Sequence, residues 1–178
     1  MRPFQNIIDL RFAVSDIADH RPISDVFARL VAQAEDDMNN RLRTRMQIRD
    51  YTFTFDDGEA ALPPDLLELI AIGGRGPAEF QVGPLTIRMP GRAGDYPGQY
   101  YARLPSITCN PTATNWLLQR YPTVYLYGVA VQAARHLRDT ELVAATTPLY
   151  AEALQLLKVD DERARWSIGA VRVKGCVP

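Results

Sequence analysis

The sequence predicts an α+β fold, in which a helical bundle carries a small inserted antiparallel β-sheet and has extended arms at both termini. Two changes of hydrophobic period support this prediction. Apolar residues recur every fourth position after Ser24, alternate with polar residues from Tyr51 to Phe55, and return to helical spacing after Pro111. The predicted parts are an N-terminal arm over residues 1–23, one domain over 24–165 with helices over about 25–44 and 112–165 and a β-rich insertion over about 50–104, and a C-terminal arm over 166–178.

The N-terminal arm carries apolar side chains without the spacing of a long amphipathic helix. Phe4, Ile7, Ile8 and Phe12 are interspersed with charged residues, and Pro22 interrupts the chain before the first predicted helix. We therefore expect this segment to be extended and to include at most a short strand.

The first predicted helix has a signal at each end. Ser24 offers a hydroxyl oxygen as the N-cap, and Asp25 suits the positive end of the helix dipole. Cations gather at the opposite, negative end, as the dipole favours: Arg41, Arg43 and Arg45. The apolar stripe of this helix consists of Val26, Leu30, Ala34, Met38 and Leu42.

The insertion is expected to contain short strands joined by turns. Asp57-Gly58 supplies a turn after the strand at residues 51–55, and segments rich in Gly and Pro separate the others. The apolar segment Leu66–Ile70 is expected to form one or two helical turns that lead into a strand. The further strand candidates are residues 79–82, 85–89 and 99–104.

The C-terminal part is predicted to be helical. Thr112 or Thr114 can cap a short helix through Trp116, and Pro122 suits the first turn of a helix that runs to about Arg138. Small residues in that helix permit close packing: Gly128, Val129, Ala130, Ala133 and Ala134. The last helix covers residues 141–165, where Asp160–Glu162 could divide it, and its expected buried side consists of Leu149, Ala153, Leu156 and Leu157.

The composition of the chain argues against several classes of function. The chain has 178 residues, a formal net charge of -1 and 47% hydrophobic residues, which suits a globular protein and provides no overall basic field for nucleic acid or an anionic membrane. Cys109 and Cys176 lack metal-ligand spacing, so we expect a reducing cytosol and no disulfide framework. No apolar run predicts a membrane span, and residues 1–4 do not resemble a signal peptide.

No motif predicts catalysis, a cofactor or a metal. His20 and His136 stand without the partners that a zinc or hydrolase site needs. The Gly73–Gly76 segment lacks the Lys and following Ser or Thr of a phosphate-binding loop. The sequence therefore predicts a protein that is not an enzyme, although an uncharacterised soluble enzyme stays as an alternative.

Arg41, Arg43, Arg45 and Arg49 form the densest basic stretch. If several copies of the protein surrounded DNA, these arginines could contact its phosphates. The favoured interpretation is that they complement the helix dipole and form surface ion pairs. An aromatic group is better suited to packing or protein contact than to base stacking: Tyr100, Tyr101, Trp116, Tyr121, Tyr125 and Tyr127.

Three stretches together resemble the head-to-tail adaptor (head-completion) proteins of bacteriophage necks. The first is VFARLVAQAE at residues 26–35 running into NRLRTR at 40–45. The second is LPPDLLEL at residues 62–69, followed by YYARLP at 100–105. The third is TNWLL at residues 114–118 running into YPTVYLYG at 121–128.

The resemblance implies a structural virion protein that forms a homo-oligomeric ring, a dodecamer, beneath the portal and extends the DNA channel. The implied partners are the portal protein, downstream tail or neck proteins and, without sequence preference, the passing DNA, with no membrane and no cofactor. The implied place is the neck of a virion whose proteins are made in the bacterial host cytoplasm. A DNA-binding accessory protein is the alternative.

Two sets of residues become candidate sites if this resemblance holds. Arg41, Arg43, Arg45 and Arg49 are expected to line the DNA channel or a seam between subunits, because cyclic symmetry turns a weak patch into a band of charge. Both arms are expected to contact neighbouring subunits or the portal. In the C-terminal arm the candidate contacts are Trp166, Ile168, Val171 and Val173.

Overall fold

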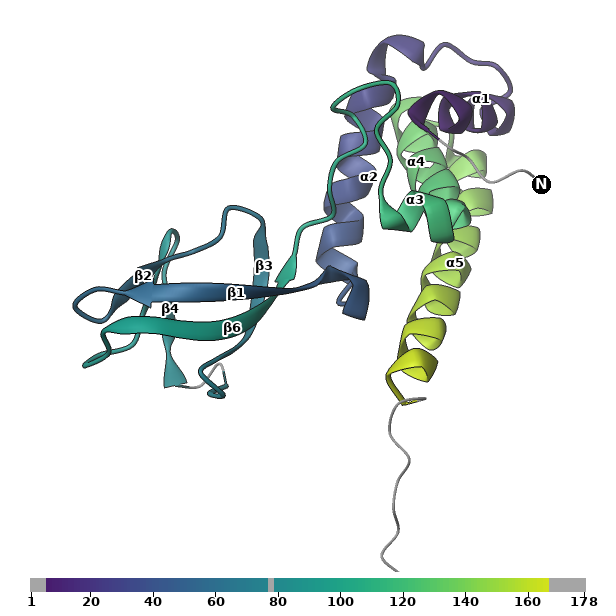
Figure 1. The fold of residues 1–178 in the computed structure, drawn as a ribbon. Helices are drawn as coiled ribbons and strands as arrows, with labels where there is room; N and C mark the ends of the chain where they lie inside the picture. The colour runs from purple at the N-terminus through teal and green to yellow at the C-terminus, as the bar shows by residue number, and fades with distance from the viewer. Residues whose placement is uncertain (1–5, 77–78, 167–178) are drawn as a thin grey trace, which may run out of the picture. The chain divides into compact units, whose positions relative to one another are not determined.

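The structure, a computed structural model, describes residues 6–76 and 79–166 and divides the chain into two compact units (Figure 1). Met1–Arg45 and Ser106–Pro178 make up the helical unit, and Met46–Pro105 makes up the β unit. Helices account for most of the first unit, and the second contains two small antiparallel sheets. The predicted α+β fold class is therefore confirmed.

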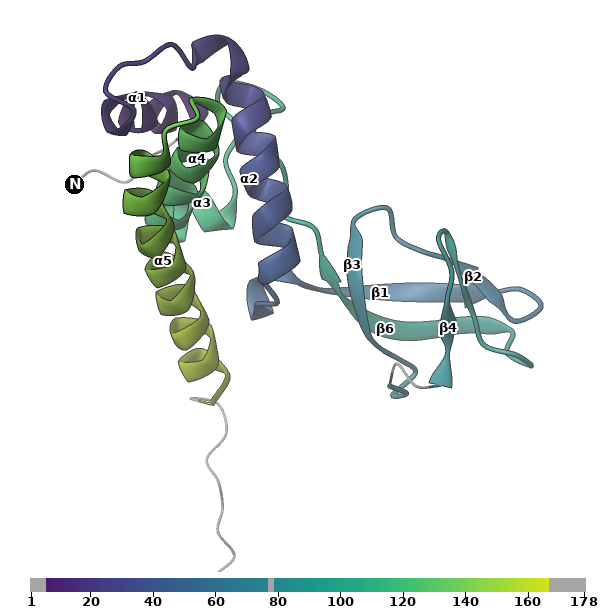
Figure 2. The same cartoon turned by 180° about the vertical axis from the view of Figure 1, so that it is seen from behind.

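The helical unit is built around one central helix, α4, which packs against α2, α5, α1 and α3 (Figures 1 and 2). Its elements are α1 (Ile7–Ile17), the 3-10 turn η1 (Ser24–Val26), α2 (Phe27–Arg41), α3 (Trp116–Arg120), α4 (Pro122–His136) and α5 (Thr140–Trp166). Helices pack on several sides of α4, so most of this helix lies in the core of the unit. Most residues of α4 are accordingly buried, including Val124, Leu126, Val129, Ala130 and Ala133.

Gly128 in α4 lets two neighbouring helices approach closely. A Cβ atom at this position would lie 2.6 Å from Met38 Cε of α2 and 3.1 Å from Tyr150 Cε2 of α5. The first distance is shorter than any van der Waals contact, so only glycine fits without displacing Met38. The prediction that small residues allow close packing of this helix is confirmed.

The N-terminal segment is not an extended arm in the part that the structure describes, since Ile7–Ile17 form α1. Asn6 caps this helix by accepting hydrogen bonds from the backbone N–H groups of Ile8 at 2.9 Å and Asp9 at 3.0 Å. Leu10 and Val14, one turn apart, are fully buried in the same unit. The prediction of an extended arm or short strand is therefore wrong for these residues.

Neither of the two predicted helix caps forms in the structure. Ser24 lies in η1, and α2 begins after Val26 without a side-chain cap. In α3 the capping residue is Asn115, whose Oδ1 accepts a hydrogen bond from Leu118 N at 2.9 Å. Pro122 occupies the first turn of α4, as predicted.

The β unit contains two three-stranded sheets, where the sequence predicted one. Its strands are β1 (Ile48–Phe55), β2 (Glu59–Ala61), β3 (Leu66–Ile72), β4 (Gln81–Val82), β5 (Thr86–Arg88) and β6 (Gly94–Ala102), and η2 (Arg45–Gln47) precedes them. The strand orders are β1-β6-β3 and β2-β5-β4, with antiparallel neighbours throughout. The Asp57-Gly58 turn leads from β1 in the first sheet to the short strand β2 in the second.

One apolar core lies between the elements of the β unit. Phe53, Phe55, Leu69, Ile72 and Ile87 are among its buried members. Leu66–Ile70, expected as helical turns, belong to β3 because Leu69 and Ile72 bury their side chains in this core. A run of consecutive apolar residues has no period that separates a short helix from a strand.

The last helix, α5, is continuous through Asp160–Glu162. Tyr150, Ala153, Leu154 and Leu157 form its buried side, whereas the side chains of Leu149 and Leu156 are 40% and 60% exposed. The expected burial of these two leucines is therefore wrong. Among the described helices, α5 included, none combines the length and apolarity that a membrane crossing requires.

Candidate functional site

The arginine segment is divided between the two units. Arg41, Arg43 and Arg45 belong to the helical unit, and Arg49 lies on β1 of the β unit. Arg41 Nε donates to Asp37 Oδ1 at 2.9 Å, one turn earlier in α2, and its guanidinium lies 5.9 Å from the centre of the Tyr150 ring. Arg41 thus pairs within its own chain, as the interpretation of surface ion pairing expects.

Arg43 closes the C-terminal end of α2. Its Nη1 atom donates to the carbonyl oxygens of Asn39 at 2.7 Å and Leu42 at 2.6 Å. These carbonyls lie at the negative end of the helix, where a cation also interacts favourably with the dipole. Arg49 has a longer contact, from its Nη1 to its neighbour's carbonyl at Ile48, at 3.4 Å.

Asp161 anchors the segment that follows α2 to the last turns of α5. Its carboxylate accepts hydrogen bonds from Arg45 N at 3.0 Å and Arg165 Nε at 3.0 Å, and it lies 3.7 Å from Arg45 Nε. Arg165 also donates to the carbonyl of Arg43 at 2.9 Å. The side chain of Asp161 is only 8% exposed, so these contacts compensate its charge where little water reaches it.

Arg41, Arg43 and Arg45 therefore all have partners within the chain, and charge still remains at the surface. The side chains of Arg41 and Arg45 remain 53% and 38% exposed. A role in a DNA channel or a subunit seam stays a prediction for all four. Of the predicted C-terminal contacts, Trp166 is the last residue of α5, and Ile168, Val171 and Val173 lie outside the described residues.

A buried polar network fixes the interior of the helical unit. Glu35 Oε1 accepts hydrogen bonds from Ile107 N at 2.9 Å and from the Tyr125 hydroxyl at 3.0 Å. The same hydroxyl accepts from Asn115 Nδ2 at 2.6 Å. Burial, together with the charge of Glu35, raises the pKa of Tyr125 well above its ordinary value. Satisfied hydrogen bonds indicate a structural network that joins α2, α3 and α4.

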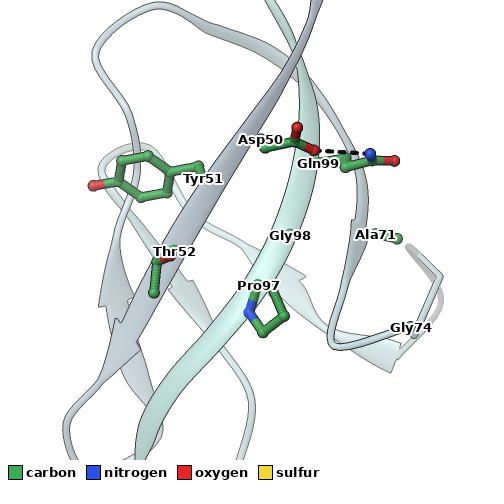
Figure 3. Close-up of a pocket in the computed structure, with 8 residues that line it drawn as sticks. All are labelled: Asp50, Tyr51, Thr52, Ala71, Gly74, Pro97, Gly98 and Gln99. Carbon is green, nitrogen blue, oxygen red and sulfur yellow. Dashed lines mark hydrogen bonds between the residues drawn. The ribbon is translucent and has the colours of Figure 1, made fainter.

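A shallow cavity of about 620 Å³ lies on the outer face of the β1-β6-β3 sheet (Figure 3). Asp50 and Thr52 of β1 and Pro97 and Gln99 of β6 line it, and Gln99 Nε2 donates to Asp50 Oδ1 at 2.9 Å. Its further lining residues are Tyr51, Ala71, Gly74 and Gly98. The side chains of Asp50 and Gln99 thus form a hydrogen-bonded polar pair in the lining of this cavity.

Four large apolar side chains are exposed in the described part of the helical unit, and they form two groups. Ile8 and Phe12, 40% and 61% exposed, lie one turn apart on α1, and Leu149 and Leu156 lie two turns apart on α5. Each group includes a charged residue on the same helix face. We define the α1 patch as Ile8, Arg11 and Phe12, and the α5 patch as Leu149, Glu152 and Leu156.

The α1 patch borders a second cavity, of about 450 Å³. Ile8 and Arg11 line it from α1, Phe27 and Ala28 line it from α2, and residues 108–111 close it. The exposed thiol of Cys109 lies in this last segment. The patch therefore combines a protruding phenylalanine with a neighbouring hollow, which suits contact with another apolar surface.

Neither apolar patch was predicted from the sequence. Asn6 followed by Leu10 and Val14 at helical spacing was the available signal for α1. The exposure of Leu149 and Leu156 had no such signal, because both fit the periodicity of a buried side. Among residues 6–76 and 79–166, no group of three or more His, Cys, Asp or Glu side chains could hold a metal ion.

Comparison with known proteins assigns the chain to a family. A search of curated proteins finds no match. The model of the SU10 adaptor protein family matches residues 5–97 and 75–174, which together span both units. Because these matches cover well over half of the sequence, the chain belongs to the SU10 adaptor protein family, a family of phage structural adaptors.

Proposed function

We propose that this protein is the subunit of a homo-oligomeric ring, a dodecamer, that docks beneath the phage portal, joins head to tail and extends the DNA channel. The observation that carries this proposal is the family match, which runs from residue 5 to residue 174 and so includes the helical and the β unit. An adaptor must contact copies of itself and other virion proteins at once. The neck of the virion is accordingly its proposed location, with portal and downstream tail or neck proteins as partners.

The surfaces of the two units support an assembly role. The helical unit exposes the α1 patch and the α5 patch, and the β unit exposes Val82 and Leu85, at 52% and 79%. Exposed apolar groups bordered by polar residues are typical of surfaces that contact other proteins. A single chain with several separate surfaces of this kind is suited to repeated contacts in an assembly.

The charge of the protein favours a ring over a DNA-binding protein that acts as a free monomer. The formal net charge is -1, and Arg41 and Arg45 already pair with Asp37 and Asp161 of the same chain. A monomer therefore offers phosphate a weak patch, whereas cyclic repetition places many copies of the remaining charge around one axis. Contact with phosphate alone also suits DNA that must pass through, since it carries no sequence preference.

Sedimentation of the full-length protein with and without purified portal rings of the same phage tests this proposal. We expect one complex in which adaptor and portal subunits are present in a fixed ratio, and binding of linear duplex DNA by free adaptor that is weak at physiological salt. A protein that leaves portal rings unbound at concentrations sufficient for assembly, or that binds DNA tightly as a monomer, contradicts the proposal. The second result favours the accessory DNA-binding alternative.

A further inference from the structure

We propose that neighbouring subunits of the ring contact each other through two different surfaces of the helical unit, the α1 patch of one copy and the α5 patch of the next. This inference rests on the proposed ring and specifies how its subunits join. The occupant of the α1 patch is thus a second copy of the same chain.

The first argument is that each patch is an unpartnered helix face of matching character. On α1, Arg11 lies at the edge of the face that carries Ile8 and Phe12, and on α5, Glu152 lies at the edge of the face that carries Leu149 and Leu156. The spacings of three, four and seven residues place each group on one side of its helix. Both faces lie outside the stripes that pack into the unit, which include Leu10 and Val14 in α1.

The second argument is the charge at the edge of each patch. The guanidinium carbon of Arg11 lies 5.6 Å from the centre of the ring of its neighbour Phe12. Within the described part of the chain, neither Arg11 nor Glu152 forms an ion pair. A guanidinium and a carboxylate that form no ion pair among the described residues, each beside two exposed apolar side chains, are complementary when the patches face each other.

The third argument is shape. The cavity of about 450 Å³ beside Ile8 and Arg11 provides a hollow, and an exposed leucine on a helix can enter it as an anchor. Leu156 is the more exposed leucine of the α5 patch, at 60%, and is the expected anchor. An amphipathic helix can bind a groove by inserting apolar side chains that are seven residues apart.

The symmetry of such a contact differs from that of a simple dimer. Because the two patches belong to different elements of one subunit, each copy uses its α1 patch on one side and its α5 patch on the other. A contact between unlike surfaces continues from copy to copy and closes into a ring when the rotation between copies allows it. A contact between two copies of the same patch would instead join the chains in pairs through that patch.

Disulfide trapping distinguishes these arrangements, because Cys109 lines the cavity of the α1 patch and is exposed. In a Cys176→Ser background, Leu156→Cys places a second thiol on the α5 patch. With portal rings present, mild oxidation should produce a ladder of covalent oligomers that extends beyond the dimer. The matched control is Lys158→Cys, an exposed position on another side of the same helix, and it should stay monomeric on a denaturing gel.

Charge exchange tests the same contact without cysteine chemistry. Arg11→Glu or Glu152→Arg alone should reduce the yield of portal-bound ring about fivefold or more, because repulsion replaces attraction in every contact around the ring. The double variant should restore the yield, and Glu162→Arg, a charge change elsewhere on α5, should have no effect. Unchanged thermal unfolding of each variant separates loss of assembly from loss of folding.

The outcomes separate this inference from the proposed function. If the parent protein forms no ring with portal, both fail. If the ring forms but the disulfides stop at the dimer, form equally at residue 158, or do not form, the contact between the α1 patch and the α5 patch is wrong and the proposed ring stands. Failure of the double charge variant to recover assembly while it folds normally overturns the pairing of Arg11 with Glu152.

Discussion

The carboxylate of Glu35 accepts a hydrogen bond from the hydroxyl of Tyr125 at 3.0 Å in the interior of the helical unit. Glu35 is 5% exposed and Tyr125 is fully buried. A carboxylate in such a place requires hydrogen-bond donors, and here they come from α4 and from the segment that follows the β unit in the chain. The stability of the helical unit should therefore depend on the hydroxyl group of Tyr125.

Tyr125→Phe should lower the free energy of unfolding by about 1–3 kcal/mol, because it removes one hydrogen-bond donor to Glu35 and the hydroxyl that accepts from Asn115 Nδ2 in a buried site. Tyr127→Phe is the matched control, since Tyr127 is two residues away in the same helix and only half-buried. Urea denaturation followed by circular dichroism measures both. Equal stability of the two variants would show that the buried network contributes nothing.

At alkaline pH, the free energy of unfolding should depend on the ionisation of two buried tyrosines. Burial raises the pKa of Tyr125 and of Tyr150 above the ordinary value of 10.0, and Asp37 adds to the effect at Tyr150 through a hydrogen bond. The folded state therefore keeps protons that the unfolded chain releases, so the free energy of unfolding is unaffected by these groups below about pH 10 and falls as the pH rises above it.

Urea midpoints measured at several pH values between about 8 and 11 test this dependence. Tyr125→Phe should reduce the alkaline slope, because the variant has no proton to retain at that position. A slope that is the same in the parent protein and the variant would contradict the assigned cause.

Asp161 should govern the order of the chain between α2 and β1. Asp161→Ala removes the acceptor of Arg45 N and Arg165 Nε and should cost about 1–3 kcal/mol. It should also speed cleavage by trypsin after Arg43 or Arg45, because the segment loses its attachment to α5. Asp160→Ala, a change of the exposed neighbour, should alter neither quantity. Protection of Arg43 and Arg45 that survives in Asp161→Ala would rule out the anchor.

Neutralising the arginine segment should weaken DNA retention in assembled particles while rings still form. Arg45 is left unchanged in this test, because its guanidinium Nε lies 3.7 Å from the carboxylate of Asp161. Arg43→Gln with Arg49→Gln changes two members of the segment, and Arg29→Gln on the exposed side of α2 is the control. Retention is measured as the fraction of particles that keep packaged DNA.

Two other results have definite meanings for the arginines. Loss of ring assembly with normal folding assigns them to the subunit seam. Particles that assemble, package and infect as the parent does leave only the local roles seen in the structure, such as the closure of α2 by Arg43.

The fold class was predictable because hydrophobic period differs between helix and strand over long segments. Hydrophobic periodicity did not predict α1, because Leu10 and Val14 are its only fully buried residues. Its cap, Asn6, lies in the segment that we interpreted as an arm. Periodicity failed again at Leu66–Ile72, where consecutive apolar residues fit either structure. In both cases packing against distant parts of the chain decided the local structure.

The candidate surfaces were harder to predict for a related reason. Helix α5 has 27 residues and packs against the 15-residue α4, so part of its length has no partner there. Leu149 and Leu156 fit a buried stripe by sequence, and only the three-dimensional arrangement shows that they are exposed. The arginine segment was recognised from the sequence, but its partners Asp37 and Asp161 depend on helix spacing and on a contact 116 residues apart.

A cryo-electron microscopy map of the portal complex, assembled from purified portal and the full-length protein, tests the central claim most directly. The account predicts a closed dodecameric ring of this chain beneath the portal, with a continuous channel through both rings and with α1 of each copy facing α5 of the next. A portal without bound adaptor, or with isolated monomers that enclose no channel, would contradict it.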